Sequence, residues 1–210
     1  MFISFEGLDF CGKSTQIELL CNYLKEKGKE VIIIREPGGT DISEKVREIL
    51  LDKKNSNMVI ETEILLFSSA RSQLVREVIL PSLEKGYFIL SDRFHDSTTA
   101  YQGYGRGIAL DFVGSLNNFV IEKAVPDLTF FIDISIQEMF IRKTAKNSRE
   151  LDRIEISSNG FYERVRNGYQ KLCDTEKRFV KIDGSESIEI IHKKIINKIE
   201  QHEKKKYETI

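Results

Sequence analysis

The chain has 210 residues, of which 40% are hydrophobic, and its formal net charge is −1. This length and apolar content exclude a disordered chain and indicate a single domain over residues 1–210, with room for a small insert. The balanced charge gives no electrostatic signal for nucleic acid, and no stretch has the pattern of a secretory leader or a membrane span. Three cysteines without metal-ligand spacing are typical of a cytoplasmic protein.

Short apolar runs alternate with longer amphipathic stretches along the chain. The runs predict strands over 2–6, 30–35, 87–91, 128–133 and 179–182. Helical spacing of apolar residues predicts helices over 15–25, 44–51, 61–83, 111–123, 136–146, 160–172 and 187–204. This alternation indicates an α/β protein with βαβ units, a mainly parallel sheet and right-handed crossovers.

A glycine-rich motif follows the first predicted strand. The pattern G-x-x-x-x-G-K-[ST] is complete in Gly7, Leu8, Asp9, Phe10, Cys11, Gly12, Lys13 and Ser14. A strand before it and a helix from Thr15 after it are the context in which backbone N–H groups hold phosphate. Lys13 can then reach terminal phosphates, and the Ser14 hydroxyl can ligate Mg²⁺. The alternative, a plain glycine turn with a solvated lysine, is disfavoured by the complete motif, so the sequence predicts a site for a nucleoside triphosphate.

Polar residues also follow the second and third strands, and ligands of parallel sheets gather beyond these carboxyl ends. The second strand is followed by Glu36 and Pro37, and the third leads into Asp92 and Arg93. Phosphate-loop enzymes place a magnesium-linked carboxylate where Asp92 stands, and an adjacent arginine such as Arg93 can clamp a phosphate. A surface Asp–Arg pair accounts for these two residues equally well.

Phe67 and Arg71 are four residues apart on one predicted helical face, where an aromatic ring and an arginine can together hold a base. Their spacing alone favours a simpler interpretation, with Phe67 in the core and Arg71 in solvent. Arg47, in the preceding predicted helix, could add a phosphate contact.

A basic segment over 142–153 follows the fourth strand and contains five cationic side chains. An arginine on a mobile segment can neutralise the charge of a phosphoryl group in transfer, so we expect a lid here. A solvated helix with ion pairs is the alternative.

Taken together, these segments resemble the bacterial type of thymidylate kinase, the dTMP kinase family. The matching segments are 7–15, 35–40 (Arg-Glu-Pro-Gly-Gly-Thr), 65–67 with Arg71, 92–103 (Asp-Arg to Ala-Tyr-Gln-Gly), 126–129, and 147–149 through Arg153. The resemblance implies a three-layer P-loop NTPase fold with a central parallel sheet and a short helical lid. It also implies transfer of the ATP γ-phosphate to dTMP with Mg²⁺, and a homodimer that binds neither nucleic acid nor membrane.

The resemblance further implies roles for individual residues. The ATP site would comprise Gly7, Leu8, Asp9, Phe10, Cys11, Gly12, Lys13, Ser14 and Thr15. The acceptor site would comprise Asp9, Glu36, Pro37, Arg47, Phe67, Arg71, Arg93, Ser97, Thr98, Tyr101 and Gln102. Catalytic charge would come from Lys13, Arg93, Arg149 and Arg153, and Mg²⁺ would be held by Ser14 and Asp92. Within the acceptor site, Phe67 would stack on thymine, Arg71 would bond its carbonyl and Tyr101 would disfavour a 2′-hydroxyl.

Two other functions stay open from the sequence. A kinase for a different nucleoside monophosphate would use the same elements. A regulatory protein that hydrolyses ATP slowly and moves its lid would also carry the phosphate-binding motif, but it would consume ATP without an added monophosphate.

Overall fold

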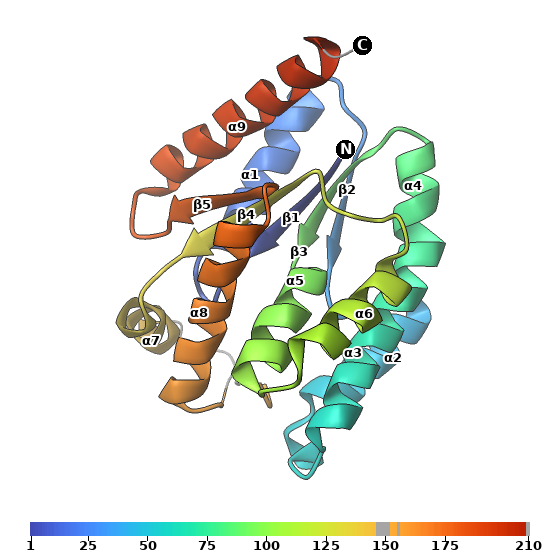
Figure 1. Cartoon of the computed structure of the whole chain (residues 1–210). Helices are drawn as coiled ribbons and strands as arrows, with labels where there is room; N and C mark the ends of the chain where they lie inside the picture. Colours follow the sequence, from blue (N-terminus) through green and yellow to red (C-terminus); the bar gives the residue numbers. More distant parts are fainter. Residues whose placement is uncertain (146–151, 155, 209–210) are drawn as a thin grey trace.

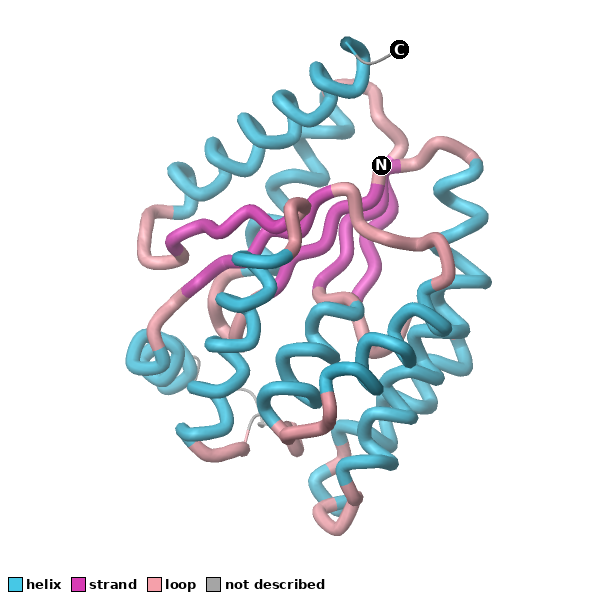
Figure 2. Tube along the Cα trace, in the orientation of Figure 1, coloured by secondary structure: helices cyan, strands magenta, loops and turns pink. Residues whose placement is uncertain are grey.

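A computed structural model describes residues 1–145, 152–154 and 156–208 and shows one parallel sheet with helices on both faces (Figures 1 and 2). The strands are β1 (Phe2–Glu6), β2 (Val31–Arg35), β3 (Phe88–Asp92), β4 (Leu128–Asp133) and β5 (Phe179–Asp183). Their order across the sheet is β2-β3-β1-β4-β5, and every neighbouring pair is parallel. The central strand β1 pairs Phe2 with Ile89 on one side and Ile3 with Leu128 on the other. The chain therefore reverses its winding direction at β1, directly before the glycine-rich motif.

The helices connect successive strands. The α-helices are α1 (Lys13–Glu26), α2 (Asp41–Leu51), α3 (Ile60–Leu74), α4 (Leu80–Glu84), α5 (His95–Thr98), α6 (Leu110–Ile121), α7 (Ile136–Ala145), α8 (Asn159–Thr175) and α9 (Ile188–Glu208). A 3₁₀ turn, η1 (Lys53–Asn55), and two π-helical segments, η2 (Val75–Ile79) and η3 (Thr99–Gly105), complete the described elements. In the part of the chain that the structure describes, no helix is both long and apolar enough to cross a membrane.

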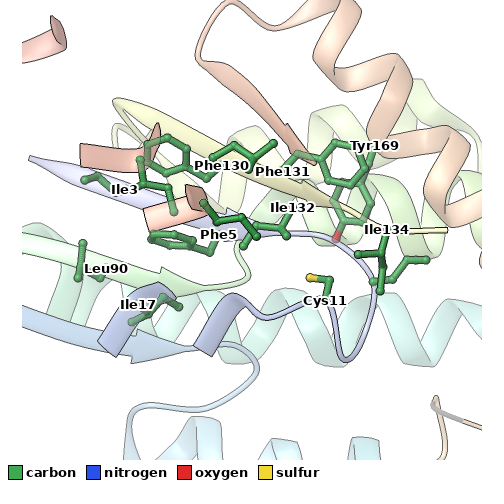
Figure 3. Close-up of a cluster of buried hydrophobic side chains, with 14 of the residues drawn as sticks. Ile3, Phe5, Cys11, Ile17, Leu90, Phe130, Phe131, Ile132, Ile134 and Tyr169 are labelled. Carbon is green, nitrogen blue, oxygen red and sulfur yellow. The ribbon is translucent and has the colours of Figure 1, made fainter. Parts of the chain in front are cut away.

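Alternating side chains of β1 serve the two faces of the sheet, as strand geometry requires. Ile3 and Phe5 belong to a buried cluster that includes Ile17 of α1 (Figure 3). Phe2 packs instead with residues of α3 and α6 on the opposite face. Glu6 has the same parity as Phe2, so its carboxylate is directed into the layer that contains α5 and α8.

The expected fold class is confirmed, and both ends of every predicted strand agree with the structure to within one residue. Two predicted features differ. The helix expected over 61–83 contains the π-helical segment η2 between α3 and α4. The polar stretch after Arg93, for which the sequence predicted neither helix nor strand, forms α5 and η3. Its residues are buried against α6 and α8, and this packing overrides their weak helix propensity.

Candidate active site

A cavity with a volume of about 760 Å³ lies at the carboxyl ends of the strands. It is lined by the glycine-rich loop, the segment after β2, one face of α3, and α5 with η3. The predicted acceptor residues all line it: Asp9, Glu36, Pro37, Arg47, Phe67, Arg71, Arg93, Ser97, Thr98, Tyr101 and Gln102. The same cavity reaches Phe10 to Gln16, so most of the predicted ATP site forms its other half. Gly7 and Leu8, also predicted for that site, do not line the cavity.

The loop between β1 and α1 has the backbone that phosphate binding requires. Gly7 has φ +139°, and a Cβ there would lie 2.5 Å from the Ile132 carbonyl oxygen, so only glycine fits. Gly12 has φ +102° and precedes Lys13, the first residue of α1. Backbone N–H groups at this helix start can therefore face an anion. The Lys13 ammonium donates to the Leu8 carbonyl oxygen at 2.9 Å.

Ser14 and Asp92 come together at the mouth of this loop. The Ser14 hydroxyl donates to Asp92 Oδ2 at 2.8 Å, although the two residues are 78 positions apart. A hydroxyl and a carboxylate form the hard oxygen set that suits Mg²⁺ when phosphate oxygens and water supply the other ligands. The described residues contain no cluster of three or more His, Cys, Asp or Glu side chains that could hold a metal by themselves. The residues present therefore fit a magnesium ion that arrives with a nucleotide.

Arg93 occupies the boundary between the two halves of the cavity. Its Nη2 donates to Asp9 Oδ1 at 2.6 Å and to the Tyr101 hydroxyl at 3.0 Å. Its Nη1 donates to the Gly7 carbonyl oxygen at 2.9 Å. The backbone of Arg93 has φ +70°, a strained conformation for a residue with a side chain, which persists only where surrounding contacts enforce it.

Arg71 is buried beneath the acceptor half. It is 2% exposed, and its Nη2 lies 2.6 Å from Glu36 Oε2. Its Nη1 donates to the Thr98 hydroxyl at 2.9 Å. Burial raises the pKa of the Glu36 carboxyl, and the charge of Arg71 opposes that rise. The interpretation of Arg71 as a solvated cation is therefore excluded.

The remaining predicted acceptor residues surround this pair. The Glu36–Pro37 peptide is cis, and Arg47 Nη1 donates to the Pro37 carbonyl oxygen at 2.7 Å. Gln102 Nε2 donates to Glu63 Oε1 at 2.9 Å, which fixes the orientation of its amide. The Arg93 guanidinium lies over the Tyr101 ring, with 4.8 Å between Arg93 Cζ and the centre of the ring.

The predicted lid is described only in part. Helix α7 ends at Ala145, and Arg149 lies outside the described residues. Arg153 is 8% exposed and does not line the cavity. Its Nη1 lies 2.7 Å from Glu63 Oε2, and its Nε donates to the Leu50 carbonyl oxygen at 2.8 Å. In this conformation Arg153 therefore fastens the end of the basic segment to α2 and α3.

Several residues that line or support the cavity were missed by the sequence analysis. Gly184, Glu186 and Ile188 extend it beyond the glycine-rich loop, beside Arg142. These residues follow β5, and ligands of parallel sheets gather beyond the carboxyl ends of the strands, so their position in the sequence could have predicted them. Glu6 and Tyr169, by contrast, carry no motif and become visible only through their contacts with Arg93 and its neighbours.

A parallel sheet with a phosphate-binding loop after its central strand, and arginine side chains that share one cavity with that loop, is typical of a P-loop phosphotransferase. A family model described as thymidylate kinase matches residues 5–195. A thymidylate kinase of Thermosipho africanus is 49% identical over 202 residues, which cover 96% of this chain and 98% of that protein. One of Chlorobaculum tepidum is 45% identical over 208 residues, covering 95% and 97%. A crystal structure of thymidylate kinase from Ehrlichia chaffeensis superposes with a TM-score of 0.77 at 35% identity, covering 95% of this chain and 98% of that one.

The chain therefore belongs to the thymidylate kinase family, as its motifs indicated.

Proposed function

We propose that this protein is a thymidylate kinase that transfers the γ-phosphate of ATP to dTMP, giving dTDP and ADP. The observation that supports this most directly is that the phosphate-binding loop and the Arg71–Phe67 pocket open into a single cavity. Two nucleotides can then lie with their phosphates facing each other across Arg93. A P-loop hydrolase would not need the second pocket.

On the donor side, the backbone of the glycine-rich loop would hold the phosphates of ATP, with Lys13 at the β- and γ-phosphates. The extension toward Arg142, Gly184 and Ile188 would receive the donor nucleoside. Ser14 and Asp92 would hold Mg²⁺, which supplies positive charge to the β- and γ-phosphate oxygens when bound.

On the acceptor side, Phe67 would stack on thymine and Arg71 would donate to a ring carbonyl. Arg71 is held by Glu36 on one edge and by Thr98 on another, so little ordering is needed when the base arrives. Glu36 Oε1 is buried and has no hydrogen-bond partner within the described residues, which leaves an acceptor for a donor group of the ligand. Arg47 and Arg93 would hold the acceptor phosphate.

The chemistry needs no covalent enzyme intermediate. The protein would bring two mutually repelling anions into line and neutralise the charge that spreads over the moving phosphoryl group. Lys13 and Arg93 line the cavity where this happens. We assign the remaining charge to the basic segment, in which Arg149 and Arg153 are both predicted donors. Arg153 would act only after leaving Glu63.

A homodimer in the cytoplasm fits the family and one feature of the surface. Helix α3 packs against both α2 and α6 (Figure 1). All three helices carry exposed apolar side chains. The exposed large apolar residues of these helices are Ile42, Ile49, Ile60, Leu65, Leu110, Phe112 and Phe119. Such patches in globular proteins mark interaction surfaces.

The test is an ADP-release assay with ATP and a panel of nucleoside monophosphates. We expect release to depend on the added monophosphate and to be fastest with dTMP. ADP release without any monophosphate would favour a regulatory ATPase, and a different preferred monophosphate would transfer the acceptor assignment to another nucleotide.

A further inference from the structure

Behind Arg93, on the side away from the cavity, lies a buried carboxylate with two hydroxyl groups around it. Glu6 is fully buried at the end of β1. The Ser97 hydroxyl donates to Glu6 Oε2 at 2.6 Å, and the Tyr169 hydroxyl donates to the same oxygen at 2.8 Å. The backbone N–H of Phe94 donates to Glu6 Oε1 at 2.7 Å. One carboxylate therefore binds α5, α8 and the residue that follows Arg93.

The two hydroxyls also contact Arg93 itself. Arg93 Nη1 donates to Ser97 Oγ and to the Tyr169 hydroxyl, each at 3.2 Å. A hydroxyl has one proton to donate and lone pairs to accept with. The two hydroxyl oxygens also lie 2.9 Å from each other, where either can be the donor. A guanidinium has donors only, so both hydroxyls present lone pairs to Arg93. Each hydroxyl thus bridges Glu6 and Arg93, and the two bridges together set the rotation of the guanidinium plane.

The two ends of the guanidinium consequently have different surroundings. Nη1 is enclosed by Ser97, Tyr169 and the Gly7 carbonyl oxygen. Nη2 faces Asp9 and Tyr101, both of which line the cavity. The anchored end therefore leaves the other end in place for a phosphate, with little rotamer freedom left to lose on binding.

Tyr169 is well placed to act as the rigid part of this bridge. It is fully buried, and its ring stacks on Phe131 of β4 with ring centres 5.1 Å apart. Figure 3 shows it at the end of the apolar cluster where the chain leaves β1. Burial raises the pKa of its hydroxyl well above the ordinary value, so it stays protonated as a donor to Glu6.

We propose that Tyr169, held by Glu6, is a positioning residue that orients Arg93 toward the phosphate of the acceptor nucleotide. The proposal rests on the acceptor site described above. It gives α8, the helix that follows the basic segment, a direct contact with the phosphate-binding arginine. Tyr169 would not touch the nucleotide; its hydroxyl acts through Arg93.

The experiment compares binding of dTMP with binding of thymidine, which lacks the phosphate, by calorimetry. The dissociation constant of thymidine divided by that of dTMP measures how much the phosphate group contributes to binding. Tyr169→Phe removes only the hydroxyl and should weaken dTMP binding about tenfold while changing thymidine binding less than about twofold. Tyr162→Phe is the matched control, because Tyr162 is buried on the same helix and its hydroxyl donates to the Ile154 carbonyl oxygen at 3.3 Å. We expect it to leave the ratio unchanged.

A double-mutant cycle separates positioning from general stability. Arg93→Ala should reduce the ratio further, and Tyr169→Phe should add no further loss in that background. If Tyr169→Phe does not fold, Glu6→Gln, at a residue that does not line the cavity, weakens the hold on both hydroxyls and should show the same selective loss for dTMP.

If the folded variant binds dTMP and thymidine as the wild type does, or more weakly by the same factor for both, the ratio is unchanged. Either result would overturn the inference while the proposed function stands. A wild-type protein that binds both ligands equally would instead remove the phosphate role of Arg93, and this inference with it.

Discussion

Cationic side chains that face the cavity interact with oxygens of the protein in two ways. Some donate hydrogen bonds to backbone carbonyls, and others form ion pairs with carboxylates. Lys13 and Arg47 donate to the backbone carbonyl oxygens of Leu8 and Pro37. A phosphate oxygen is a stronger acceptor than a carbonyl, so a nucleotide can take over these donors. Arg71 and Glu36 form a buried ion pair instead. Removing either member would leave a buried charge unpaired, so we expect this pair to persist when ligand binds.

Lys13 gives the simplest test at this scale. Lys13→Ala should lower turnover by about 10²–10³, the typical effect of losing one group that stabilises transition-state charge. The thermal midpoint should stay close to that of the wild type, because the bonds lost are to loop carbonyls. Lys25→Ala, an exposed lysine of the same helix, should change neither quantity. Normal turnover in a folded Lys13→Ala protein would remove the phosphate-loop assignment.

At the scale of elements, the strands were predictable and part of the site was not. Strands buried on both faces read as continuous apolar runs, and β4 has the predicted bounds of Leu128–Asp133. The segment α5–η3 contains Ser, Thr and Gly, which are weak helix formers, and its helical form depends on distant packing. A Cβ on Gly105 would lie 2.8 Å from Val165 Cγ2, so glycine permits the close approach of α8. No local pattern carries this information.

The same limit applies to the site. Phe67 and Arg71 were ambiguous from their spacing, because four-residue spacing places two residues on one face without saying which face is buried. Tyr169 is 76 residues from Arg93, and only the fold brings them together. Arg153 was predicted to act on the moving phosphoryl group from its place in a basic segment, and its pairing with Glu63 of α3 was not visible.

Arg153 tests how the basic segment is attached. Arg153→Ala would deprive buried Glu63 of one partner and the Leu50 carbonyl oxygen of its side-chain donor. We expect the free energy of unfolding in urea to fall by about 2–3 kcal/mol, at the low end for a broken buried pair because Arg106 and Gln102 still bond Glu63. Arg106→Ala is the matched control, since it removes the other arginine and leaves the basic segment attached.

Kinetics of the same proteins then distinguish the two roles of Arg153. An anchoring role predicts that stability and turnover fall together in Arg153→Ala. Unchanged stability with a large loss of kcat would show that Arg153 leaves Glu63 during the reaction and reaches the phosphoryl group, as the sequence suggested.

At the scale of the whole molecule, helices α2, α3 and α6 together expose several large apolar side chains to solvent. Phe119 is 76% exposed, and Phe112, seven residues earlier on the same helical face, is 51% exposed. The acceptor pocket is built partly from α3, which contributes Phe67 and Arg71. An interface on the outer face of α3 would therefore support the pocket from behind.

Phe119→Asp tests this directly. A charge in the middle of an apolar interface is costly to desolvate. We expect the wild type to elute as a dimer in size-exclusion chromatography with light scattering, and the variant as a monomer. Ile190→Asp is the control, because Ile190 is 49% exposed in the first turn of α9, where an acidic residue suits the helix dipole. The control should remain dimeric.

If α3 depends on the partner for its position, monomeric Phe119→Asp should also bind dTMP more weakly while its ATP affinity is preserved, since the phosphate loop belongs to the other side of the cavity. A monomeric wild type would show that there is no contact between copies. A dimeric Phe119→Asp variant would show that the contact lies on another surface.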